Sequence, residues 1–238
     1  MSDGKIVSRV GTLADTYVIS DLRLERRGYL RIVSCAVEGA KHRNECMHRG
    51  SAVIVMPVDW YRRLVYLIVQ PRPNKALVRH PEAAAALAVT ETEGRHDGKI
   101  VVPASAIHVI DCPAGMIDHG ETEVAAAVRE VKEETGFVID ESRLARVSDH
   151  FTSVGGSTER HVCFIADVSG LVPEPKAEGD GDERIETREF EFAEAKEMLR
   201  DGRVDSGSLA IMLRELIIRD KENLIALQAV SLVHPKIL

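Results

Sequence analysis

The chain has 238 residues, with 31 Lys and Arg against 38 Asp and Glu, which gives a formal net charge of −7. The length suits one large domain or a domain with an appendage, and the 45% of apolar residues are enough to form a core. The acidic balance argues against a general nucleic-acid or membrane-surface binder, because such proteins usually display a basic face. If a protein of this charge handles phosphates, something else must attract them, and a divalent cation is the obvious candidate.

The cellular compartment is indicated by the absence of long apolar runs and by the spacing of the cysteines. No run approaches the ~18 apolar residues that a membrane span needs, and Met1–Lys5 has no apolar core of the signal-peptide kind. A metal site built from His42, Cys46 and His48 is disfavoured, since it lacks a fourth ligand. We therefore expect a cytoplasmic protein whose cysteines are free thiols. The cysteines are Cys35, Cys46, Cys112 and Cys163, with no C-x-x-C pair.

The first part of the chain favours β-structure. Short β-favouring pieces occur between residues 5 and 37, and the polar segment Lys41–Gly50 is typical of a turn or linker. Two apolar runs follow, Ala52–Met56 and Leu64–Val69, with a turn near residues 59–63. They predict a β-hairpin whose strands are buried on both faces.

A helical segment interrupts these strands. Pro81–Val89 is rich in alanine and predicts a short helix with Pro81 at its first position. A polar loop is expected over residues 90–99, and an apolar piece at Ile107–Ile110 follows it.

Residues 122–135 carry the clearest helical pattern. Val124, Val128 and Val131 recur at i, i+4 and i+7 and form one apolar face. Gly136 follows directly and suits the left-handed position that ends many helices.

The rest of the chain alternates strands and helices. Strands are predicted at His161–Val168 and Ile185–Phe192, separated by an acidic loop at Pro173–Glu183. Helices are predicted at Glu194–Leu199 and from Ser208 onward. This mixture predicts an α+β sandwich.

Three glutamates form the most informative cluster. On a helix, Glu130, Glu133 and Glu134 are neighbours at i, i+3 and i+4, away from the valine face. Carboxylates this close repel one another, so Mg²⁺ or Mn²⁺ is a natural counter-charge. The loop Gly115–Gly120 can bend and bring a backbone carbonyl to the same ions. A solvated helix face remains the alternative for an isolated E-x-x-E-E pattern.

The whole segment from Gly115 to Phe137 resembles the Nudix box, G-x5-E-x7-R-E-U-x-E-E-x-G-U, where U is a bulky apolar residue. All seven fixed residues match, and Val131 and Phe137 fill the apolar positions. Nudix hydrolases cleave a nucleoside diphosphate linked to another group. The resemblance implies an α/β/α sandwich with a mixed sheet.

The resemblance also assigns roles within the box. It implies that Glu130 and Glu134 are the principal metal ligands in the catalytic set, with Glu133 nearby. It implies that Arg129 orients a box glutamate and that Glu121 fixes the geometry between loop and helix. The residues expected to be structural in the motif are Gly115, Glu121, Arg129 and Gly136.

Outside the box the chain is similar to the ADP-ribose pyrophosphatase branch of the family. Four segments carry this likeness: Arg49–Val53, Gln70–Arg72, Asp111–Gly115 and the loop Ser153–Arg160, which resembles S-P-G-G-x-x-E. Together they extend the resemblance over roughly residues 48–220.

These segments imply further site residues. Arg72 is expected to contact phosphate, with Arg49 and Asp111 as further substrate-binding residues. The carbonyl of Ala114 is expected to bind metal, and Glu159 to act as a metal ligand or general base. The alternatives are an ordinary surface arginine at position 72 and a solvated loop glutamate at position 159.

The sequence departs from the branch in three places. Val154 replaces the usual proline, Asp111 replaces a common glutamate, and an insertion lies near Pro81–Ala106. Such an insertion is also a feature of some UDP-sugar pyrophosphatases, so base and sugar identity stay open.

The resemblance implies Mg²⁺-dependent hydrolysis of ADP-ribose or a related nucleoside diphosphate sugar. The alternatives are a UDP-glucose or GDP-mannose pyrophosphatase and, from another class, a non-catalytic nucleotide-sugar sensor. Residues 1–47 are expected to form a β-rich extension that makes a homodimer, and residues 48–238 the hydrolase domain. No nucleic-acid or membrane partner is expected.

Overall fold

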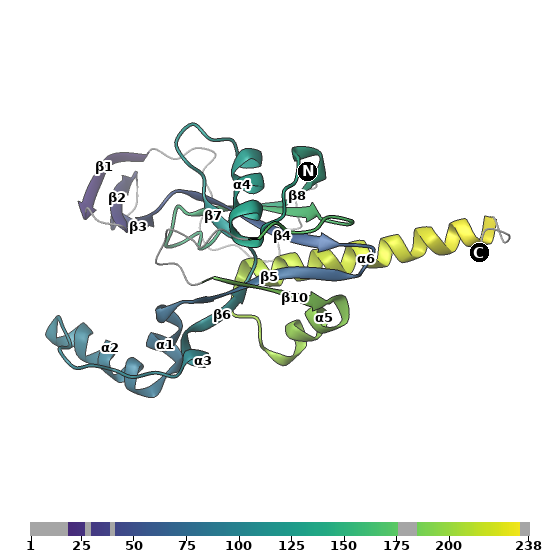
Figure 1. The fold of residues 1–238 in the computed structure, drawn as a ribbon. Coiled ribbons are helices and arrows are strands. Elements are labelled where there is room, and N and C mark those ends of the chain that lie inside the picture. The colour runs from purple at the N-terminus through teal and green to yellow at the C-terminus, as the bar shows by residue number, and fades with distance from the viewer. Residues whose placement is uncertain (1–18, 27–29, 39–40, 176–184, 234–238) are drawn as a thin grey trace, which may run out of the picture. The chain divides into compact units, whose positions relative to one another are not determined.

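The computed structural model describes residues 19–26, 30–38, 41–175 and 185–233, with side chains described up to residue 222. Its contacts divide the chain into two compact units, which are described separately. The first comprises Met1–Arg49 and Phe151–Glu159, and the second Gly50–His150 and Arg160–Leu238. The predicted division between residues 47 and 48 stays a prediction. The elements are labelled in Figure 1.

The described part of the first unit contains an antiparallel sheet with the order β1-β2-β3. Its strands are β1 (Ile19–Arg26), β2 (Arg31–Val37) and β3 (Asn44–His48). The turn or linker predicted over residues 41–50 is therefore wrong for Asn44–His48, which form β3. Strand β3 is polar, and its register with β2 is set by main-chain pairing from Cys35↔Asn44 to Arg31↔His48 rather than by an apolar pattern.

The second unit is built on a mixed sheet, which has seven strands among the described residues. The predicted hairpin is confirmed as β4 (Ser51–Asp59) and β5 (Leu64–Pro71), and both strands are buried almost throughout. The two strands pair with each other only beside their turn, because β7 pairs with β4 and β6 with β5 farther along. The remaining strands are β6 (His108–Asp111), β7 (Ala114–Met116), β8 (Leu144–Phe151), β9 (Arg160–Asp167) and β10 (Glu186–Glu191).

Helices cover both faces of this sheet (Figure 1). Helix α4 (Glu123–Thr135) packs on the face that carries Val53 and Val55. Helices α5 (Phe192–Asp201) and α6 (Gly207–Val233) pack on the face that carries Ile54 and Met56. Alternate residues of β4 thus enter two cores, which explains its continuous apolar sequence. The predicted α+β sandwich with a mixed sheet is confirmed.

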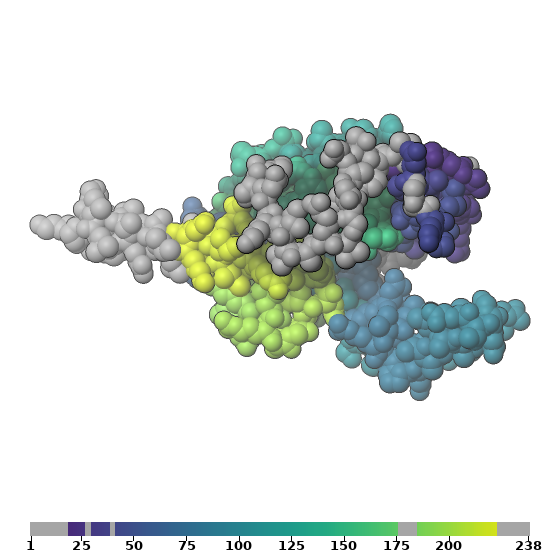
Figure 2. All heavy atoms as spheres, turned by 180° about the vertical axis from the view of Figure 1, so that it is seen from behind, coloured from purple at the N-terminus to yellow at the C-terminus, as the bar shows by residue number. Residues whose placement is uncertain are grey.

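The segment between β5 and β6 is helical. It contains α1 (Pro73–Arg79), α2 (Pro81–Glu93) and α3 (Ala104–Ile107). The helix predicted from Pro81 is confirmed, but it continues into the stretch predicted as a loop and ends at Gly94, whose φ is 81°. Helix α1 was not predicted. In Figure 2 these helices form a blue-teal lobe that stands out beside the yellow-green α5.

The predicted C-terminal elements are confirmed as β9, β10, α5 and α6, with shifted ends. Strand β8 was not predicted, and most of the acidic loop at residues 173–183 lies outside the described residues. Within the part of the chain that the structure describes, no helix is long and apolar enough to cross a membrane.

Candidate metal and phosphate site

Helix α4 is capped at its N-terminus by Thr122 and at its C-terminus by Gly136. The Thr122 hydroxyl accepts a hydrogen bond from the Ala125 N–H at 3.1 Å and caps the first turn. Gly136 ends the helix with a φ of 79°, and a Cβ at this position would lie 2.3 Å from the Glu174 carbonyl oxygen. Both constraints select glycine here. The helix that carries the box glutamates is therefore fixed at both ends.

Two of the box glutamates are buried against the strand that precedes the helix. Glu130 is 7% exposed and Glu134 is 9% exposed. The Glu134 Oε2 atom accepts a hydrogen bond from the Ala114 N–H at 2.9 Å. A Cβ on Gly115 would lie 1.7 Å from the Glu130 Oε1 atom, so only glycine leaves room for this carboxylate. Both carboxylates thus converge on the backbone of β7.

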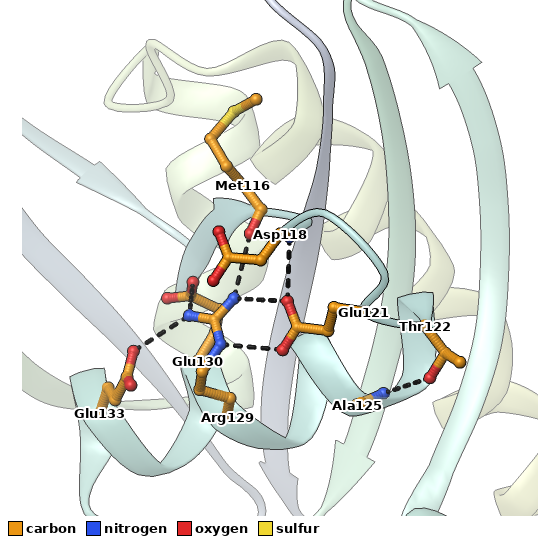
Figure 3. A network of polar contacts seen from close by, with 8 residues as sticks. All are labelled: Met116, Asp118, Glu121, Thr122, Ala125, Arg129, Glu130 and Glu133. Carbon is orange, nitrogen blue, oxygen red and sulfur yellow. Dashed lines mark hydrogen bonds and ion pairs between the residues drawn. The ribbon is translucent and has the colours of Figure 1, made fainter.

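Arg129 holds the loop and the helix together (Figure 3). Its Nε and Nη2 atoms donate to the two carboxylate oxygens of Glu121, each at 3.0 Å. Nη2 also donates to the Met116 carbonyl at 3.0 Å, and Nη1 donates to Glu130 at 2.5 Å and to Glu133 at 3.1 Å. Glu121 accepts a further bond from the Asp118 N–H at 3.1 Å. Arg129 thus contacts the loop through Glu121 and Met116 and the helix through Glu130 and Glu133, while its expected orienting role and the loop-fixing role of Glu121 stay predictions.

The electrostatics of this cluster favour an additional cation. Burial raises the pKa of Glu130, although the Arg129 guanidinium beside it opposes the rise. The hydrogen bond from Arg129 lowers the pKa of Glu121, and Glu121 in turn holds the pKa of Arg129 above its ordinary value. One guanidinium therefore faces the carboxylates of Glu121, Glu130 and Glu133. The excess of negative charge suits a divalent cation.

The oxygen atoms near β7 are candidate ligands for the Mg²⁺ or Mn²⁺ that the sequence implies. No group of three or more His, Cys, Asp or Glu side chains in the described part of the chain is arranged to hold a metal ion. The structure instead offers the buried oxygens of Glu130 and Glu134 beside the main chain of Ala114. Carboxylate and carbonyl oxygens are the ligands that hard divalent cations take, so these residues fit Mg²⁺ or Mn²⁺ in chemistry.

Glu133 differs from its two neighbours. Its side chain is 57% exposed, and it reaches the site only through the Nη1 atom of Arg129. The solvated-surface alternative considered for the whole cluster therefore describes Glu133 and does not describe Glu130 or Glu134.

Arg72 and Asp111 end the strands beside the insertion. Arg72 follows β5 and occupies the N-cap position of α1, with an exposed side chain. Asp111 ends β6, and its Oδ1 atom accepts a hydrogen bond from the Cys112 N–H at 2.9 Å. Burial raises the pKa of Asp111 to about 6, against lowering by Cys112, Ser206 and the Arg72 charge. The two residues are therefore electrostatic neighbours.

The remaining expected site residues, Arg49 and Glu159, belong to the first unit. Arg49 Nη1 lies 3.3 Å from the Glu159 Oε1 atom, and the Glu159 side chain is largely buried. The loop that carries Glu159 is held to β3, since the Met47 N–H donates to the Gly156 carbonyl and the Thr158 N–H to the Met47 carbonyl, each at 2.9 Å. Arg49, which was expected to bind substrate, is thus an ion-pair partner of Glu159 in this structure.

Other residues that shape the site carry no motif. Thr187 on β10 donates from its hydroxyl to the Glu134 carbonyl at 2.5 Å. Glu123, in the first turn of α4, pairs with Arg146 on β8 and Arg160 on β9. These contacts fix α4 against the sheet, and no local sequence pattern indicates them because each joins residues far apart in the chain.

The chain resembles known proteins in both sequence and fold. A family model described as NUDIX domain matches residues 79–209. A GDP-mannose pyrophosphatase of Klebsiella pneumoniae is 30% identical over 176 residues, which cover 74% of this chain and 75% of that protein. An ADP-ribose pyrophosphatase of Bacillus subtilis is 29% identical over 169 residues, covering 68% and 86%. A crystal structure titled ADP compounds hydrolase shares the fold, with a TM-score of 0.62 and 19% identity over 89% of this chain and 98% of that one.

Proposed function

The chain belongs to the NUDIX family, and from this premise we propose that it hydrolyses the diphosphate linkage of a nucleoside diphosphate sugar. With ADP-ribose the products are AMP and ribose 5-phosphate. The observation that carries the proposal is the convergence of two buried carboxylates, those of Glu130 and Glu134, on the glycine-containing backbone of β7. Buried carboxylates are costly to a fold unless cations or hydrogen-bond donors offset their charge. Because the single guanidinium of Arg129 is shared among Glu121, Glu130 and Glu133, a divalent cation would lower this cost further.

In this proposal Glu130, Glu134 and the carbonyl of Ala114 hold Mg²⁺ or Mn²⁺. The chemistry that such a cation supplies is neutralisation of the diphosphate charge and activation of a water molecule. Arg129 keeps the Glu130 carboxylate in place, and Glu133 supports Arg129 from the solvent side. The roles of these side chains follow from their contacts and from the family motif.

The substrate side of the proposed site consists of Arg72 and Asp111. Arg72 is exposed at the end of β5, where its guanidinium is free to reach a phosphate oxygen of the substrate. It would stabilise the negative charge that develops on the phosphate that leaves. Asp111, next to it, would orient either Arg72 or a hydroxyl group of the substrate.

Hydrolysis adds one water molecule across the P–O–P linkage. The water oxygen bonds to one phosphorus, and the bridging oxygen leaves with the other phosphate. The proton that the water loses needs an acceptor, and we propose Glu159 as that base or as a further metal ligand. Support for this role is the match of its loop to the branch pattern and its own burial beside Arg49.

The name of the Klebsiella relative favours a second substrate, GDP-mannose, which would give GMP and mannose 1-phosphate. UDP-glucose stays an alternative substrate, because an insertion like the one near Pro81–Ala106 also occurs in some UDP-sugar pyrophosphatases. A sensor without catalysis is disfavoured, since a sensor has no need of the complete glutamate set.

A panel of nucleoside diphosphate sugars, assayed by liquid chromatography with and without Mg²⁺, tests the proposal. We expect turnover of ADP-ribose or GDP-mannose that EDTA abolishes. E134Q keeps an oxygen for the Ala114 N–H, so it should fold normally and lose most activity. K132Q, at an exposed position on the same helix, is the matched control and should stay active. Release of diphosphate from nucleoside triphosphates in preference to sugar-linked substrates would refute the proposal.

We also propose that the chain forms a homodimer through its first unit. Support comes from β1, an outer strand of the described sheet, whose exposed side chains include Ile19, Leu22 and Leu24. Exposed apolar strands of this kind tend to associate. The cytoplasmic location expected from the sequence stays a prediction.

A further inference from the structure

Asp205 lies in the loop between α5 and α6 and is ion-paired with two residues of helix α1. Its Oδ2 atom is 2.7 Å from Lys75 Nζ, and its Oδ1 atom accepts a hydrogen bond from Arg79 Nη1 at 2.5 Å. The Asp205 side chain is only 15% exposed, and that of Lys75 is 20% exposed. A partly buried carboxylate with two partners contributes more to the stability of the fold than an ordinary surface ion pair does.

Both partners of Asp205 belong to α1, a helix that needs outside support. Lys75 and Arg79 are like charges at i and i+4, and they repel each other when unpaired. The helix has seven residues, which is too short to be stable without tertiary contacts. Asp205 neutralises the repulsion and fixes both side chains at once.

Helix α1 in turn positions Arg72, which is its N-cap residue. The Arg72 N–H donates to the Ile107 carbonyl at 2.7 Å, and the Arg72 carbonyl accepts from the Lys75 N–H at 3.0 Å. The Lys75 ammonium also donates to the His108 carbonyl at 2.8 Å. Lys75 therefore connects Asp205 to His108 at the start of β6. The residue before it, Ile107, is the one whose carbonyl binds the Arg72 N–H.

We propose that Asp205 is a positioning residue, which orients the phosphate-binding Arg72 through Lys75 and helix α1. This inference rests on the proposed function, since it takes Arg72 as the phosphate contact. It assigns the loop between α5 and α6 a part in substrate binding, and no family motif covers that loop.

The surroundings of Asp205 strengthen the argument. It lines a cavity of about 320 Å³ between α1, α3, β5, β6 and the loop that follows α5. Without its carboxylate, Lys75 and Arg79 would repel each other at this cavity and shift α1. The other two arginines that line the cavity have partners of their own, since Arg188 pairs with Glu186 and Arg203 with Asp201 and Glu194.

The decisive experiment is a double-mutant cycle between Asp205 and Arg72, measured as kcat and KM for the substrate found in the panel. We expect D205N to lower kcat/KM about tenfold, mainly through KM, because a displaced arginine binds the phosphate less well. In an R72A background D205N should have almost no further effect, since the two residues act in series. D205E, which keeps the charge, should restore most of the loss.

Two controls separate positioning from a general loss of structure. E197Q removes an exposed partner of Arg200 on α5, outside the cavity that Asp205 lines, and should leave KM unchanged. K75M removes the same ion pair from the other side and should reproduce D205N, so the test does not depend on one variant folding. Thermal melting checks that each variant is folded.

A measurement independent of turnover completes the design. Hydrogen exchange of the amides in residues 74–80 should become faster in D205N and stay unchanged in E197Q. Unchanged exchange, or additive effects of D205N and R72A in an active enzyme, would overturn the inference and leave the proposed function intact. Absence of wild-type activity across the sugar panel would refute the proposed function instead.

Discussion

Gly115 and Glu130 are complementary in shape: the carboxylate of Glu130 occupies the space that a side chain at position 115 would need. A Cβ on Gly115 would lie 1.7 Å from Oε1 and 2.2 Å from the carboxyl carbon. The motif selects glycine at position 115 because a larger residue would collide with the Glu130 carboxylate of the motif's own helix. The backbone conformation of Gly115 is not needed to explain this selection.

The first prediction follows from this contact. G115A should displace the Glu130 carboxylate, whose oxygens and carboxyl carbon occupy the place of the added Cβ, and should lower kcat/KM by roughly 100-fold. Steady-state kinetics with saturating Mg²⁺ will measure it. G207A is the control, because a Cβ there meets nothing within 4 Å and the position begins α6. Normal activity of G115A would show that the Glu130 position is not needed for catalysis.

The second prediction concerns the pair formed by Glu121 and Arg129. E121A removes the carboxylate that accepts from both Nε and Nη2, so Arg129 loses its fixed orientation and Glu130 loses a well-placed partner. We expect the apparent affinity for Mg²⁺ to fall about 10-fold or more, as is usual for residues that orient metal ligands. Activity as a function of Mg²⁺ concentration measures this shift. An unchanged Mg²⁺ requirement would show that the pair only stabilises the loop.

Much of this site was predictable from the sequence because its residues lie close together in the chain. The helix over 122–135 and its end at Gly136 follow from periodicity and the position of the glycine. The roles of Arg129 and Glu121, which the resemblance implied, stay predictions, and the contact between the two side chains supports them. The family, the sandwich and the hydrolase class expected from that motif are confirmed by the NUDIX match, the shared fold and the relatives' names.

Other features had no local signal. Strand β3 was missed because it is polar and is held by its backbone, and α1 was missed because a seven-residue helix shows less than two full periods. The burial of Glu130 and Glu134 was not predicted either, since the glutamate face was expected to point away from the apolar one. Contacts such as those of Asp205 with Lys75 and Arg79 join segments more than 120 residues apart.

The third prediction concerns the N-cap of the box helix. T122A removes the hydroxyl that accepts from the Ala125 N–H, and it should lower the free energy of unfolding by about 1 kcal/mol. In a protein of this size the melting temperature should fall by roughly 2–4 °C. Catalysis should be preserved, because the glutamates lie two turns farther along. T122S is the matched control and should melt like the wild type.

The fourth prediction uses the raised pKa of Asp111. Burial raises this pKa from an ordinary 3.8 to about 6, so the folded state prefers the protonated carboxyl. The stability that this group contributes is complete below the unfolded pKa, near 4, and is lost as the pH rises through 6. D111N, which stays neutral, should therefore be more stable than the wild type at pH 8 by on the order of 2 kcal/mol. The difference should vanish near pH 4.

Denaturant unfolding of metal-free protein between pH 4 and pH 8 will show this dependence. Asp140 provides a control of opposite sign, because its pKa is lowered by hydrogen bonds from Ser142. D140N should lose stability above its unfolded pKa, and that loss should disappear as the pH falls. A stability difference between D111N and the wild type that does not change with pH would contradict the assignment to burial of the Asp111 charge.

The fifth prediction tests the association of the first unit. Light scattering at micromolar concentration should give twice the 26.2 kDa of one chain. L22K places a charge on β1, where the Leu22 side chain is 74% exposed, and should shift the protein toward the monomer. V101K is the control, since Val101 is equally apolar and 85% exposed but belongs to the insertion. If L22K and V101K both leave the mass unchanged at twice the chain, another surface forms the dimer, and a wild-type mass of one chain would exclude the dimer itself.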